Sequence, residues 1–97
     1  MSRPTRPIAL ITGGAKRVGR ASALALARAG CDIVITYRGS KPEADATVAE
    51  AIRLGGSPNE CRALSLELGN PESVEAVALD LARSLPRLDV LVHNAST

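Results

Sequence analysis

Short apolar runs alternate with longer amphipathic stretches along this chain of 97 residues. The runs Pro7–Thr12 and Asp32–Tyr37 are continuous and rich in β-branched residues, which is typical of strands buried on both faces. The shorter runs Cys61–Leu66 and Leu88–Ser96 predict a third and a fourth strand, and the fourth leads into a polar corner.

The stretch from Val18 to Ala29 has the spacing of a helix, and Gly30 supplies its stop signal. The positions that repeat at i, i+3, i+4 and i+7 are Ala21, Leu24, Ala25 and Arg28. We therefore expect one helix between the first two strands.

Two further helices are marked by their end signals. A capping box of Ser40 and Glu43 predicts the start of the second helix. Asn70 as N-cap, Pro71 at the first helical position and Pro86 as a breaker predict the bounds of the third.

Strict alternation of strands and helices predicts an α/β fold, a Rossmann-type doubly wound parallel sheet in the order β-α-β-α-β-α-β. Such sheets bind ligands beyond the carboxyl ends of their strands, near the reversal of strand order. Residues 1–7 are basic and interrupted by prolines, so we expect a flexible tail there and a single domain over residues 8–97.

Composition narrows the classes of function. The only aromatic residue is Tyr37 and the net charge is +2, which argues against a nucleic-acid partner. The run Ile8–Ile11 is too short to cross a membrane. Cys31 and Cys61 lack metal-ligand spacing, so we expect inert, partly buried thiols and a cytoplasmic protein.

The turn after the first strand, Thr12–Gly19, has the sequence TGGAKRVG. It is not a P-loop, because Arg20 and Ala21 stand where lysine and a hydroxyl residue belong, and it is not GxGxxG, because Lys16 replaces the middle glycine. It fits T-G-x-x-x-[G/R]-x-G, and here the chain resembles the short-chain dehydrogenase/reductase family. An ordinary strand–helix connection is the alternative.

The resemblance implies that this turn holds the pyrophosphate of a dinucleotide. A glycine at 13 allows the tight turn, and a glycine at 19 allows close packing of the helix start, whose dipole favours an anion. The family mostly has glycine where this chain has Arg17, and the arginine resembles the pteridine reductase branch. The expected cofactor contacts here are Gly13, Lys16, Arg17, Val18 and Gly19. A solvated surface side chain is the alternative for Arg17.

The end of the second strand indicates which dinucleotide binds. An NAD site has Asp or Glu there, about 20 residues beyond the glycine turn, whereas this chain has no acid before Glu43. The guanidinium of Arg38 would instead favour a 2′-phosphate, so the expected cofactor is NADP. Expected contacts on this segment are Tyr37, Arg38, Gly39 and Ser40. Ser40 can cap the second helix, bind the phosphate, or do both.

Two further segments match the family in part. The resemblance implies that Glu67 and Leu68 bind adenine, although the family usually has Asp in place of Glu67. The corner after the fourth strand is expected to line the ribose and phosphates through Asn94, Ala95 and Ser96. We assign no chemistry to His93, since a lone histidine at a strand end is more often structural.

In this family a Tyr-x-x-x-Lys pair on a later helix does the chemistry. Tyr37 and Lys41 have that spacing, but they lie at a strand end near the expected adenine side, so we treat the match as a coincidence. The resemblance covers residues 8–97 as the N-terminal half of a dinucleotide-binding domain. We therefore expect a fragment without catalytic residues, inactive alone, whose fourth strand is an exposed apolar edge.

The function implied is the cofactor-binding half of an NADP-dependent oxidoreductase. The full protein would transfer hydride from NADPH to a C=O or C=N bond. A pterin or folate is one expected substrate, and a 3-oxoacyl or sugar-like carbonyl compound is the alternative. A non-catalytic NADP(H) sensor or interaction module is the alternative. By resemblance the full-length protein would be a homotetramer, and neither a nucleic acid nor a membrane is expected as a partner.

Overall fold

The structure is a computed structural model, and it describes residues 6–13, 17–58, 60–66, 70–84 and 89–93. Strands and helices alternate as the sequence predicts. In chain order they are β1 (Ile8–Thr12), α1 (Arg17–Arg28), β2 (Asp32–Tyr37), α2 (Lys41–Arg53), β3 (Arg62–Ser65), α3 (Pro71–Ser84) and β4 (Val90–His93). β3 begins one residue after the start and ends one residue before the end of the apolar run Cys61–Leu66. Of the fourth run, residues 88 and 94–96 lie outside the described residues.

The four strands form one parallel sheet in the order β3-β2-β1-β4, which confirms the predicted α/β class. β1 is central, and its Leu10 is paired with Val34 of β2 on one side and with Leu91 of β4 on the other. The chain winds from β1 outward to β3 and then returns to the other side of β1. The reversal of strand order therefore lies between β1 and β4, where such sheets bind ligands.

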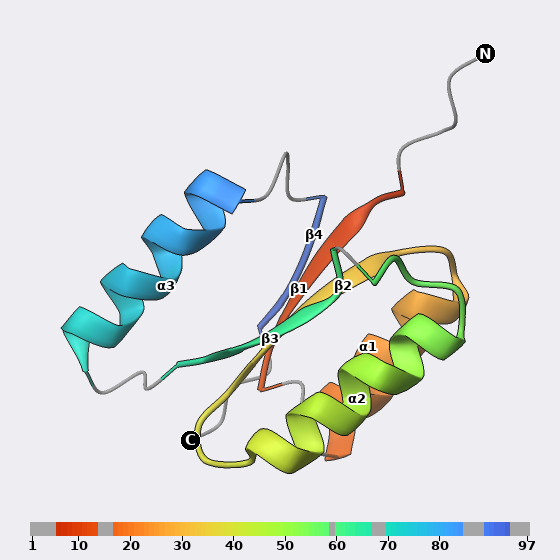
Figure 1. Ribbon diagram of the computed structural model, residues 1–97, viewed down its shortest axis with the longest axis horizontal. Coiled ribbons are helices and arrows are strands. Elements are labelled where there is room, and N and C mark those ends of the chain that lie inside the picture. Colours follow the sequence, from red (N-terminus) through yellow and green to blue (C-terminus); the bar gives the residue numbers. More distant parts are fainter. Residues whose placement is uncertain (1–5, 14–16, 59, 67–69, 85–88, 94–97) are drawn as a thin grey trace.

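Helices cover the two faces of the sheet unequally. Figure 1 shows α1 and α2 side by side on one face, with α3 alone on the other. The core lies under α1 and α2, where Ile33 and Ile35 of β2 are fully buried. Most of the buried helix residues in this core are alanines, which allow the helices close approach to the sheet: Ala23, Ala27, Ala44 and Ala51.

The buried side of α1 differs from the predicted stripe. Ala21, Ala25 and Arg28 are exposed, and of the four predicted positions only Leu24 is buried. The buried positions are Gly19, Ala23, Leu24 and Ala27. Alanines lie all around this helix, so spacing predicts a helix but not which row of small residues faces the sheet.

The predicted capping box of α2 is wrong, whereas the predicted cap of α3 is confirmed. Ser40 occupies the N-cap position of α2, but its side chain makes no capping hydrogen bond. The ring of Pro42 removes one of the two amides that a serine cap can bind. At α3 the Asn70 side-chain oxygen accepts from the amides of Glu72 at 2.9 Å and Ser73 at 3.4 Å.

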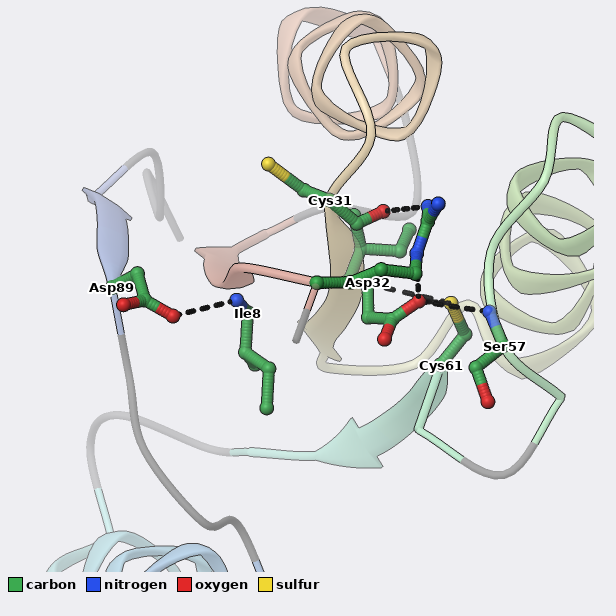
Figure 2. A network of polar contacts seen from close by, with 8 residues as sticks. Ile8, Cys31, Asp32, Ser57, Cys61 and Asp89 are labelled. Atoms are coloured by element: carbon green, nitrogen blue, oxygen red, sulfur yellow. Dashed lines mark hydrogen bonds and ion pairs between the residues drawn. The ribbon is translucent and has the colours of Figure 1, made fainter. Parts of the chain in front are cut away.

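A polar network fixes the amino-terminal edge of the sheet (Figure 2). The carboxylate of Asp32, which is 4% exposed, accepts from Arg6 Nε at 2.9 Å and from the amide of Ser57 at 2.8 Å. The thiol of Cys61 lies 3.9 Å from the same oxygen. This network attaches Arg6, which the sequence places in a flexible tail, to β2. Residues 1–5 of that tail lie outside the described residues.

The start of β4 is attached to the start of β1. Asp89 Oδ2 accepts from the amide of Ile8 at 2.9 Å, and the amide of Asp89 donates to the carbonyl of Ile8 at 2.9 Å. On β4, Val90 and Val92 pack against the core, whereas Leu91 between them is 61% exposed. Within the described part of the chain β4 is thus an exposed apolar edge, as the sequence predicts.

Candidate functional site

The carboxyl ends of β2, β1 and β4 lie side by side and form the carboxyl edge of the sheet, which is distinct from the lateral edge at β4. The turn after β1, the segment after β2 and the corner after β4 all begin at this edge. All three were singled out in the sequence. Of the residues expected to bind the cofactor, six lie outside the described residues: Lys16, Glu67, Leu68, Asn94, Ala95 and Ser96.

The glycine turn begins with a left-handed residue, since Gly13 has φ of 69°. Its amide donates a hydrogen bond of 3.1 Å to the hydroxyl of Thr36 on β2. Gly19 is buried in the first turn of α1. The first turn of α1 has no acidic residue. Its amides and the helix dipole therefore produce a positive field at this edge.

Arg17 is the first residue of α1 and has φ of 54°, the one positive φ outside glycine among the residues described. For a residue with a Cβ, the left-handed region costs about 1–2 kcal/mol. Arg17 and its neighbour Val18 are exposed, so burial of these side chains does not offset that cost. The strain is in the turn that the sequence assigns to a phosphate, and such strain is often found at binding sites.

The segment after β2 turns outward from the core. Tyr37 is half-buried and packs against the core, whereas Arg38 and Gly39 are exposed. Ser40 follows as the residue before α2, with its side chain not used as a cap. Arg38 is thus two residues from Thr36, which is bonded to the glycine turn. The two segments expected to bind the cofactor are therefore neighbours.

Lys41 belongs to α2 and not to this group of cations. Its ammonium group donates to Asp45 at 2.8 Å, and this hydrogen bond raises the pKa of Lys41. Tyr37 ends a strand while Lys41 begins a helix. The two residues are therefore not one turn apart on a single helix, as a catalytic pair of this spacing would be.

Two buried threonine hydroxyls also lie at this edge. Thr12 begins the motif of the glycine turn, whereas Thr36 has no place in any motif of the sequence. Thr12 Oγ1 donates to the carbonyl of Val92 at 3.4 Å, which joins the ends of β1 and β4. Thr36 joins the end of β2 to the glycine turn. The available signal was a polar residue near the end of each apolar run. Backbone pairing places His93 opposite Thr12.

The described residues contain no group of three or more His, Cys, Asp and Glu side chains that could hold a metal ion. Cys31 and Cys61 are free and buried, as predicted, and burial raises the pKa of the Cys61 thiol. No helix in the described ranges is long and apolar enough to span a membrane.

Comparison with known proteins gives a family for this arrangement. The family model described as short chain dehydrogenase matches residues 7–97. The 3-oxoacyl-[acyl-carrier-protein] reductase of Synechocystis sp. is 39% identical over 95 residues, which are 98% of this chain and 37% of that protein. The corresponding reductase of Staphylococcus aureus is 36% identical over 90% of this chain and 34% of its own length.

Solved structures agree with these matches. Acetoin dehydrogenase YohF from Salmonella typhimurium superposes with a TM-score of 0.82 at 34% identity, over 94% of this chain and 37% of that one. RhlG from Pseudomonas aeruginosa, solved as an NADP active-site complex, gives a TM-score of 0.80 at 31% identity, over 94% of this chain and 35% of that one. The chain thus spans about a third of the length of these relatives.

Proposed function

The chain belongs to the short-chain dehydrogenase family, and from this premise we propose that it forms the NADP-binding part of an oxidoreductase. The observation that carries the proposal is the hydrogen bond of 3.1 Å between Gly13 and Thr36. It brings the glycine turn, with Arg17, beside the strand end that leads to Arg38. The family uses NAD or NADP, so the choice of NADP is the specific claim.

Physical chemistry favours the phosphorylated cofactor at such a site. No carboxylate lies between the end of β2 and Glu43 to accept the ribose hydroxyls of NAD. Arg17 and Arg38 are exposed cations on the two adjoining segments. A hydrogen bond to a charged group is worth about 1.5–3 kcal/mol. Two such bonds to the 2′-phosphate would favour NADPH over NADH by about a hundredfold or more.

The remaining contacts belong to the same proposal. Because the Ser40 side chain makes no capping hydrogen bond to α2, we propose that it binds the phosphate instead. The positive amino end of α1 would hold the pyrophosphate, with Gly13 and Gly19 giving the backbone its close approach. The further contacts proposed are Lys16, Val18, Tyr37, Gly39, Glu67, Leu68, Asn94, Ala95 and Ser96.

We propose hydride transfer from NADPH to a carbonyl group as the activity of the whole protein. NADPH supplies the hydride when bound, while the segments described above would hold its adenosine and phosphate groups. Several relatives are named as reductases of 3-oxoacyl carrier-protein substrates, which places C=O ahead of C=N. The pterin alternative depends only on Arg17 and the Ala95–Ser96 corner. A homotetramer is proposed by analogy with the family.

Calorimetry on Arg38→Asp tests the choice of cofactor. We expect the dissociation constant for NADPH to rise at least tenfold, about the effect of losing one charged hydrogen bond, and binding of NADH to be kept or improved. Arg28→Asp is the matched control, because Arg28 is also exposed but lies in the last turn of α1. If Arg38→Asp leaves the ratio of the NADPH and NADH dissociation constants unchanged, the proposal is contradicted.

A further inference from the structure

Thr36 is a polar side chain in a strand that is otherwise apolar after its first residue. It is 3% exposed, and its neighbours Val34 and Ile35 are fully buried. A buried hydroxyl costs free energy unless it is hydrogen-bonded, so a buried strand generally has valine or isoleucine at such a position. Here the hydroxyl oxygen accepts the amide hydrogen of Gly13 at 3.1 Å.

This bond extends the connection between β1 and β2 beyond their backbone ladder. The pairing between the two strands ends at Ile11 and Ile35. The Thr36–Gly13 bond lies further toward the carboxyl ends, where the chain leaves β1 with Gly13 in the left-handed region. It therefore constrains the first residue of the turn, at the point where the two chains begin to separate.

We propose that Thr36 is a positioning residue that sets the spacing between the glycine turn and the Arg38 segment, and thereby the preference for a 2′-phosphorylated dinucleotide. The proposal rests on the proposed function. A 2′-phosphate held by both Arg17 and Arg38 needs the two segments at the right distance from each other. NADH has no 2′-phosphate, so its binding does not depend on that distance in the same way. Hydrogen bonds weaken steeply as distance and angle depart from their optimum. Loss of the Thr36 bond should therefore weaken NADPH binding more than NADH binding.

Three variants of the chain separate this role from a general loss of stability. Thr36→Val keeps the shape and removes the hydroxyl, and Thr36→Ser keeps the hydroxyl. Thr47→Val is the matched control, because Thr47 is fully buried and its hydroxyl donates to the carbonyl of Glu43 within α2 at 2.9 Å. The readout is the pair of dissociation constants for NADPH and NADH, measured by calorimetry.

For Thr36→Val we expect the NADPH constant to rise about fivefold, the equivalent of one ordinary hydrogen bond, and the NADH constant to rise less than about twofold. Thr36→Ser should restore the wild-type ratio, and Thr47→Val should not change it. A wild-type chain that prefers NADH contradicts the proposed function. A wild-type chain that prefers NADPH, with the same ratio in Thr36→Val, contradicts the positioning role alone.

Amide exchange in the cofactor-free protein tests the contact itself, even if Thr36→Val does not fold. In the wild type we expect the Gly13 amide to exchange slowly, as a hydrogen-bonded group does. In Thr36→Val it should exchange faster, with the wild-type rate recovered in Thr36→Ser. Fast, unprotected exchange of Gly13 in the wild type would overturn the proposal whatever the variants bind.

Discussion

At the scale of single residues, Arg17 combines an unfavourable backbone with an exposed side chain. Its φ of 54° lies in the left-handed region, which glycine adopts at little cost. A strained arginine is explained if the guanidinium makes a contact that glycine cannot make. The proposed contact is with the cofactor. Substitution of Arg17 should therefore have different effects on the free energy of unfolding and on the affinity for NADPH.

For Arg17→Gly we expect the free energy of unfolding to stay constant or rise by up to about 1 kcal/mol, because the left-handed strain is relieved. The dissociation constant for NADPH should rise about tenfold with the lost charged contact. Urea titration and calorimetry measure the two quantities. Arg17→Ala is the control, which loses the side chain but keeps the strain, so its affinity should fall without any gain in stability. Unchanged NADPH affinity in both variants would contradict the proposed contact.

The sequence could single out candidate charged residues for the proposed site but not the hydrogen bonds between its segments. The glycine spacing of the turn marks Arg17, and the absence of an acidic residue after β2 marks Arg38. Both are patterns within a short stretch of sequence. The bond from Gly13 to Thr36 joins residues 23 apart, and the ion pair of Arg6 with Asp32 joins residues 26 apart. Such contacts depend on which strands are neighbours, and a single sequence has no periodicity that encodes this.

Cys61 has a thiol whose ionisation opposes folding. The thiol accepts a hydrogen bond from the amide of Ile33 at 3.4 Å, and a Cβ on Gly56 would come within 2.6 Å of its sulfur. Burial is the largest cause of its raised pKa. A thiol with a higher pKa in the folded chain stabilises the fold while it is protonated. That contribution is complete below the pKa of the unfolded chain and is lost as the pH rises through the folded value.

We therefore expect the free energy of unfolding to fall as the pH rises above about 8.5, the ordinary pKa of a free thiol. The measurement is denaturant unfolding in a Cys31→Ala background, in which Cys61 is the only thiol. Adding Cys61→Ala to that background should flatten the curve over the same interval. If the two curves run parallel, the titration of Cys61 does not contribute.

At the scale of the elements, the helix ends show how local signals succeed or fail. Asn70 precedes Pro71, whose missing amide hydrogen would have no partner within the helix in any case. The Asn70 side chain accepts from the next two amides, those of Glu72 and Ser73. Ser40 has the same position before α2, but Pro42 is its second helical residue. Both starts match a capping pattern in the sequence, but Pro71 leaves both capping amides of α3 in place, whereas Pro42 removes one of those of α2.

These two caps form a matched pair for mutation. Asn70→Ala should lower the free energy of unfolding by about 1 kcal/mol, the usual value of a capping side chain. Ser40→Ala should change it by less than about 0.5 kcal/mol, as expected for a side chain without a structural bond. Urea titration of both variants measures the difference. Equal losses would mean that Ser40 also stabilises α2 through its hydroxyl.

At the scale of the whole molecule, the alternation of elements could be predicted but the strand order could not. Each strand and helix has its own local pattern of residues. The order of the elements along the chain, and with it the parallel sheet, therefore follows from local information. The side of β1 on which β4 lies is not encoded in this way. It depends on contacts such as the paired bonds between Asp89 and Ile8, which lie 81 positions apart. This placement makes β4 the edge of the described sheet.

That edge has consequences for the behaviour of the chain in solution. An edge strand presents backbone groups that can pair with another copy, and an apolar side chain there favours such pairing. Leu91 on β4 is 61% exposed, and Leu79 on α3 is 48% exposed. The two leucines have similar exposure, but Leu91 lies on the edge strand of the described sheet, whereas Leu79 lies on a helix. They therefore separate the effect of an open edge from that of exposed apolar surface in general.

We expect the chain to self-associate at high concentration, and Leu91→Lys to reduce this association by placing a charge on the edge. Leu79→Lys introduces the same charge away from the edge and should leave the association unchanged. Both substitutions are at exposed positions, so each should change the free energy of unfolding by no more than about 0.5 kcal/mol. Sedimentation velocity over a range of concentrations measures the effect. Equal reductions by both variants would assign the association to net charge, and no reduction by Leu91→Lys would exclude the β4 edge as the contact.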